Sequence, residues 1–120
     1  MSRLNELLDG PRSMHKTVAA ASTNATVVKA SAGKVYSIQV NNVNAAVRYL
    51  KLYNLAVAAT VGTSVPVKTL AVPAASSQQF DFPGGLNFSV GIGFALTTEA
   101  TDAGTTGVSA NEHVVNVDYS

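Results

Sequence analysis

Hydrophobic and polar residues alternate in short runs along most of this chain. Tyr36, Ile38 and Val40 would share one face of an extended strand. Ser37 and Gln39 would share the opposite face. A period of two residues predicts a β-strand with one buried face and one face that is wet or meets a partner.

Similar runs recur along the chain, each bounded by Gly, Pro, Ser, Thr or Asn. The predicted strands are 26–29, 35–40, 47–53, 65–72, 78–82, 86–88, 92–98 and 113–119. Seven or eight short strands in about 100 residues are typical of an antiparallel β-sandwich or a small β-barrel. The sequence therefore predicts an all-β domain.

Prolines and glycines add detail to this pattern. Pro66 and Pro73 flank a run that we expect at a sheet edge, because proline lacks the amide donor that a central strand needs. The Pro83-Gly84-Gly85 segment predicts a tight turn between two strands. Gly91 and Gly93 predict a close backbone approach or a β-bulge.

The first residues follow a different pattern. Leu4, Leu7 and Leu8 have the i, i+3, i+4 spacing of a short amphipathic helix, which Asp9-Gly10-Pro11 would stop. Two helical turns are unstable alone and need a surface to lie on. We therefore predict an N-terminal arm over residues 1–16 that docks on a neighbouring subunit through these leucines, and a β-sandwich domain over residues 17–120. A frayed terminus is the alternative.

Composition narrows the class of protein. Apolar residues make up 47% of the 120 residues and charged residues only 12%, with a formal net charge of +1. Weak charge gives little self-repulsion, so we expect a homo-oligomer or a subunit of a lattice. The basic residues are scattered, which excludes nucleic acid as a direct partner. No cysteine, signal peptide or membrane-spanning run is present in the sequence, so we expect no export by a signal peptide and no membrane partner.

The residues that carry catalytic chemistry are few. His15 and His113 have no serine, cysteine or carboxylate at the spacing of a catalytic triad. Glu112 adjoins His113, but neighbouring strand residues point to opposite faces, so the pair shares a site only where the backbone is irregular. We predict a protein that is not an enzyme and binds no cofactor.

The polar segment 97–111 is predicted to be a loop. Its Glu99 and Asp102 are oxygen ligands of the kind that calcium binds. The segment lacks the dense Asp and Asn spacing of calcium loops, and an exposed hairpin loop explains it equally. We predict no metal site.

One strand carries large side chains on both faces. Leu50 and Leu52 share one face, and Tyr49, Lys51 and Tyr53 share the other. The second set fits a subunit interface or a second buried face. Aromatic rings beside a cation also suit a sugar-binding platform.

Several segments together resemble small virion proteins of tailed bacteriophages, of the capsid decoration or cement kind. They are Val-Asn-Asn-Val-Asn-Ala-Ala-Val-Arg-Tyr-Leu-Lys-Leu-Tyr-Asn at 40–54, Pro-Val at 66–67, Phe-Pro-Gly-Gly at 82–85, Gly-Ile-Gly-Phe-Ala-Leu-Thr at 91–97 and Asn-Glu-His-Val-Val-Asn-Val-Asp-Tyr at 111–119. The resemblance covers roughly residues 34–120.

The resemblance implies a jelly-roll-like β-sandwich that is made in the host cytoplasm and lies on the capsid surface. Its expected partners are the major capsid protein and copies of itself, as a trimer or a dimer. It implies a stabilising role, in which the protein bridges capsomers on the outside of the shell, and no catalytic residues. Similar domains occur in tail and fibre proteins. A receptor-binding or carbohydrate-binding module that uses Tyr49 and Tyr53 is therefore the alternative function.

Overall fold

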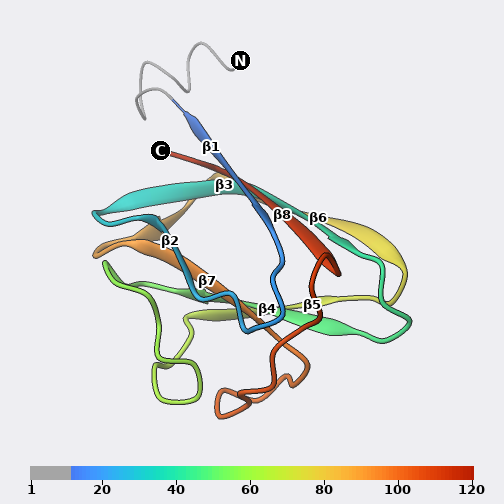
Figure 1. The fold of residues 1–120 in the computed structure, drawn as a ribbon. Coiled ribbons are helices and arrows are strands. Elements are labelled where there is room, and N and C mark those ends of the chain that lie inside the picture. The colour runs from blue at the N-terminus through green and yellow to red at the C-terminus, as the bar shows by residue number, and fades with distance from the viewer. Residues whose placement is uncertain (1–11) are drawn as a thin grey trace.

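The structure, a computed structural model, describes residues 12–120 and shows eight strands there (Figure 1). They are β1 (Ser13–Val18), β2 (Thr26–Lys29), β3 (Gly33–Asn42), β4 (Arg48–Tyr53), β5 (Lys68–Val72), β6 (Ser76–Phe88), β7 (Ile92–Thr97) and β8 (His113–Tyr119). No helix that could cross a membrane is found among these residues.

The strands form two antiparallel sheets stacked face to face, as Figure 1 shows. The first sheet has the order β1-β8-β3-β6 and the second the order β2-β7-β4-β5. Strands far apart in sequence are therefore nested as pairs: the first with the eighth, the second with the seventh, the third with the sixth and the fourth with the fifth. This is the arrangement of an eight-stranded jelly roll, and the predicted all-β sandwich is confirmed.

The core lies between the sheets and consists of the inward-facing positions of both. Leu50 and Leu52 of β4 and Ile38 and Val40 of β3 are at most 1% exposed, as the alternation predicts. Tyr36 is the exception, because the register shifts between Val35 and Ser37. Across this irregularity Val35 joins the core cluster and Tyr36 does not.

Two predictions about prolines have different outcomes. The segment with Pro66 and Pro73 does border an edge strand, β5, as expected. The tight turn predicted at Pro83-Gly84-Gly85 is wrong, because β6 continues through these residues and pairs with β3 on both sides of them. Residues 82–85 bulge out of the ladder, and Gly84 and Gly85 supply the positive φ values of 79° and 90° that the bulge needs.

The sandwich begins earlier than the sequence predicts. Residues 13–16 lie in β1 and pair with β8, so the expected boundary between arm and domain falls inside a strand. Sequence patterning missed this strand because it is an edge strand whose outward side chains include Lys16 and the highly exposed Met14. The predicted helix and its three leucines lie outside the described residues.

Two long loops run under the second sheet, residues 54–67 and 98–112 (Figure 1). The first loop passes so close to Gly91 that a Cβ atom there would lie 2.3 Å from the carbonyl oxygen of Leu55. The two loops meet where Gly62 packs on Thr105. The outer face of the second sheet is therefore covered by the chain itself.

Candidate functional site

The outer face of the first sheet is open and polar. The register aligns Lys16, Asn116, Gln39 and Gln79 in one row across all four strands. A shallow groove of about 600 Å³ runs over this row. The face therefore offers amide and hydroxyl groups at the regular spacing of a sheet.

Charges on this face are few, and two of them form an ion pair. The guanidinium of Arg12 lies 3.4 Å from the carboxylate of Asp118 and 3.9 Å above the ring of Tyr36. Gln79 Nε2 donates a 3.0 Å hydrogen bond to Asp81. These contacts hold side chains in place and leave a nearly neutral surface.

The outer face of the second sheet contains the other predicted interface residues, and it is closed. Lys51 and Tyr53 are each 0% exposed, and Tyr49 is half-buried. The expectation that all three side chains meet a partner or a sugar is therefore wrong for Lys51 and Tyr53, because loop 98–112 covers them. Of the interpretations offered by the sequence, a second buried face is the one that the structure supports.

Lys51 holds this covering loop in place. Its ammonium donates a 2.6 Å hydrogen bond to the carbonyl oxygen of Thr101 and a 3.5 Å bond to that of Gly104. These two bonds tie the backbone of loop 98–112 to β4. Among residues 12–120, no three His, Asp or Glu side chains gather where they could hold a metal ion.

Contacts in the same loop shift the pKa values of two ionisable groups, the Tyr53 hydroxyl and the Glu99 carboxyl. Burial, with the added effect of the nearby Asp102 charge, raises the pKa of the Tyr53 hydroxyl, which has no hydrogen-bond partner among the described residues. Hydrogen bonding to Thr106 lowers the pKa of the exposed Glu99 carboxyl. This hydrogen bond from Thr106 N to Glu99 Oε1 joins two parts of loop 98–112.

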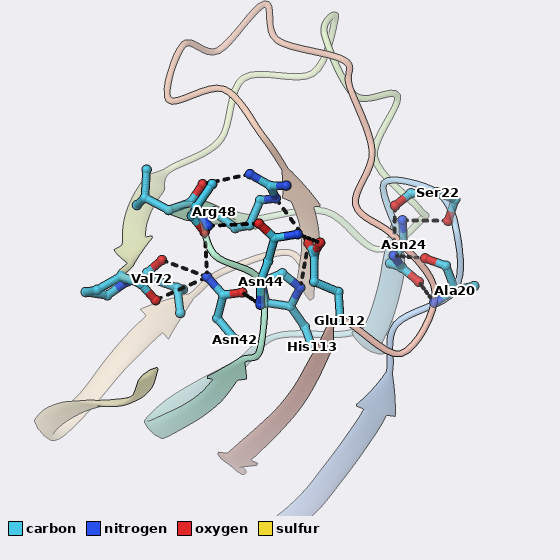
Figure 2. A network of polar contacts seen from close by, with 12 residues as sticks. Ala20, Ser22, Asn24, Asn42, Asn44, Arg48, Val72, Glu112 and His113 are labelled. Atoms are coloured by element: carbon cyan, nitrogen blue, oxygen red, sulfur yellow. Dashed lines mark hydrogen bonds and ion pairs between the residues drawn. The ribbon is translucent and has the colours of Figure 1, made fainter. Parts of the chain in front are cut away.

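A buried polar cluster fastens the far part of the same loop to the sandwich (Figure 2). Glu112 is 4% exposed and accepts a 2.6 Å bond from Asn44 Nδ2 and a 3.0 Å bond from Arg48 Nε. Asn42 donates through Nδ2 to the carbonyl oxygens of Ala46, Val72 and Pro73, at 3.0, 3.2 and 3.1 Å. The cluster joins β3, β4, β5 and β8 at one end of the molecule.

Glu112 and His113 are neighbours in space as well as in sequence. His113 Nδ1 lies 3.4 Å from the Glu112 carboxylate. The irregular backbone that this requires is a turn in which Asn111 has φ 60° and Glu112 N donates to Ser109 O. Yet His113 is 1% exposed, so its ring is closed to any substrate in solution. The pair is structural.

Burial lowers the pKa of His113 below its ordinary 6.5; the Glu112 charge opposes this shift and the Arg48 charge adds to it. Below pH 6.5 His113 therefore binds a proton more readily in the unfolded chain than in the folded protein. We expect the free energy of unfolding to fall as the pH is lowered from about 7 to about 5.

Urea unfolding of the wild type and of His113→Gln across this range measures the effect. The variant should lose this part of the pH dependence, while His15, present in both proteins, cancels from the comparison. An equal pH dependence in the two proteins would contradict this assignment.

The remaining histidine is also part of the packing. His15 Nε2 lies 2.7 Å from the Thr17 hydroxyl, and its ring packs edge-on against Phe94, with centroids 6.1 Å apart.

The sequence did indicate the polar face, through Ser37 and Gln39, but not which outer face the loops leave open. That depends on contacts between distant segments.

Comparison with known proteins gives structural similarity alone. No protein-family model and no curated protein matches the chain. The chain is similar to the coat protein of Tobacco streak virus, at 10% sequence identity and a TM-score of 0.42, over 91% of this chain and 85% of that one. A second structure, the coat protein dimer of the same virus, aligns at 10% identity and a TM-score of 0.35, over 88% of this chain and 83% of that one.

Proposed function

We propose that this chain is a structural protein of a virus particle, and more narrowly a decoration protein of a tailed bacteriophage. In this proposal it binds the outside of the capsid, bridges capsomers and stabilises the shell. Its partners are the major capsid protein and copies of itself, and its action is adhesive, not chemical.

The observation that carries the proposal is the contrast between the two outer faces. Loops cover the face with Lys51 and Tyr53, whereas the row from Lys16 to Gln79 is left open. A largely polar face with few charges, two of them paired, can lie against another protein at little cost in buried charge. The bacteriophage resemblance of residues 40–54 and 111–119 supplies the narrower identity.

Multivalency makes such a surface effective. Each copy needs only modest affinity, because a shell presents many equivalent sites and linked copies bind together. The leucines at positions 4, 7 and 8 belong to this proposal as a second contact, with a neighbouring subunit. Tyr49 is only half-buried, and it belongs to this proposal as a further contact.

A charge placed on the open face tests this role. Gln39 is exposed at the centre of the polar row, and Gln39→Arg is expected to lower occupancy on particles about tenfold or more, because the new charge would be desolvated at the contact. Thr63→Arg, exposed in loop 54–67 under the other sheet, is the matched control and should bind as the wild type does.

Occupancy is measured by adding each protein to particles that lack it and imaging them by electron cryomicroscopy. Equal binding of Gln39→Arg and wild type would remove the open face from the contact. Density for the chain on the tail, or retention on a polysaccharide column that Gln39→Arg abolishes, would favour the tail or carbohydrate-binding role instead.

A further inference from the structure

The four described sheet edges are not protected alike. Edge strands expose unpaired backbone groups, and proteins commonly block them with lysine, proline or a bulge. Lys16 lies on β1, Lys29 on β2 beside a register shift, and Lys68 on β5, with Pro73 directly after that strand. The fourth edge, β6, has no basic residue in any of its 13 positions, and its Pro83 and its bulge both lie in residues 82–85. The part of β6 from Ser76 to Asp81 therefore has none of these three features.

The β6 edge also has exposed apolar surface. Phe80 and Phe82 point inward from it but are only partly buried at the rim of the core cluster. Between Ser76 and Asp81 the strand pairs regularly with β3, one residue to one, until the bulge at 82–85 interrupts the ladder. A short, regular and nearly uncharged edge is thus left open, with no described strand beside it.

We propose that the outer edge of β6 is an interface between two copies of this chain, in which the two strands pair antiparallel about a two-fold axis at Phe80. The first sheets of the two copies would then form one continuous sheet with a continuous polar face. This inference deepens the proposed function, on whose self-association it rests, by naming the surface through which copies meet.

In this register residues 79–81 of one copy lie opposite residues 81–79 of the other, and this short sequence is self-complementary. Phe80 lies opposite Phe80 of the second copy, so two half-exposed rings cover each other. Gln79 lies opposite Asp81 on the polar face, and it does so twice by symmetry. These two side chains already form a hydrogen bond within one strand, which shows that their chemistry matches. An axis at Asp81 would instead oppose two carboxylates.

Cysteine pairing tests the register directly, because the chain has no native cysteine. A mixture of Gln79→Cys and Asp81→Cys proteins should form a disulfide-linked dimer under mild oxidation, since directly opposite residues lie within reach of a disulfide. Either variant alone should link far less, because diagonal positions are about 7–8 Å apart. Met14→Cys, exposed on the opposite edge strand β1, is the control and should not link.

Charge variants test the strength of dimerisation without a disulfide cross-link. Gln79→Asp places like charges opposite Asp81 and should weaken dimerisation several-fold in sedimentation velocity, whereas Gln79→Lys should strengthen it. Thr63→Asp, exposed in loop 54–67 under the other sheet, should leave it unchanged. Circular dichroism confirms that each variant is folded.

The proposal is overturned if the wild type stays monomeric at every concentration tested and the cysteine mixture does not link. It is also overturned if Gln79→Asp and Gln79→Lys shift the equilibrium in the same direction. These measurements use free protein, so they are independent of particle binding. Dimers that fail to bind particles would refute the proposed function alone, and monomers that bind them would refute this interface alone.

Discussion

Replacing Glu112 with alanine is expected to lower the free energy of unfolding by about 3–5 kcal/mol, the usual effect of removing one partner from a buried ion pair. The carboxylate side chain is 3% exposed and satisfies both Asn44 and Arg48. Its loss leaves the largely buried Arg48 charge without a partner and an amide without an acceptor. It also frees the turn before β8. Urea unfolding at neutral pH measures the change.

Two variants show whether the effect is due to the buried charge. Glu112→Gln keeps the shape and an acceptor oxygen, and should be destabilised less than Glu112→Ala. Asp118→Ala removes the ion pair with Arg12, whose side chains are 31% and 29% exposed, and should change stability by less than about 1 kcal/mol. If Asp118→Ala and Glu112→Ala were equally destabilised, the polar cluster would have no special role.

Lys51→Ala is expected to be destabilised by about 2–5 kcal/mol, in the range of removing a long buried side chain. The substitution creates a cavity under loop 98–112 and leaves the carbonyl oxygen of Thr101 without its charged donor. We expect this loop to open locally, so that amide hydrogens of the segment exchange faster. Hydrogen exchange and urea unfolding measure the local and the global effect.

Lys51→Met separates the charge from the volume. Methionine fills most of the space but donates no hydrogen bond, so this variant should recover much of the global stability and still show faster exchange in loop 98–112. Lys68→Ala, an exposed lysine of the neighbouring strand, is the control and should be close to wild type. Unchanged exchange in Lys51→Met would contradict the role of the ammonium in holding the loop.

Local periodicity was sufficient to predict the sandwich and strands β2 to β8, with β6 in two pieces, but not the edge strand β1. Leu50, Leu52, Ile38 and Val40 alternate with other residues, and each is buried as that alternation requires. Residues that depart from this alternation do so because of how their strand pairs with a neighbouring strand. Tyr36 is buried but lies outside the core cluster, because the pairing of β3 with β6 and β8 shifts between Val35 and Ser37, and no pattern within β3 alone signals that shift.

The candidate site was harder to predict for the same reason. Lys51 has the sequence context of a surface residue, and only the path of a loop 50 residues away buries it. Glu112 and His113 share a cluster because of one turn at Asn111 with a positive φ. The residues of the open face were visible as polar positions, but their exposure depends on where two distant loops lie.

The nested pairing of strands has a consequence for biosynthesis. The partner of β1 is β8, almost 100 residues later in the chain, and β2 likewise depends on β7. While a ribosome is still making β8, β1 lacks its neighbour, and Val115 and Val117 are missing from the core. The sandwich therefore cannot close before β8 has been made, and until then its apolar residues are open to aggregation.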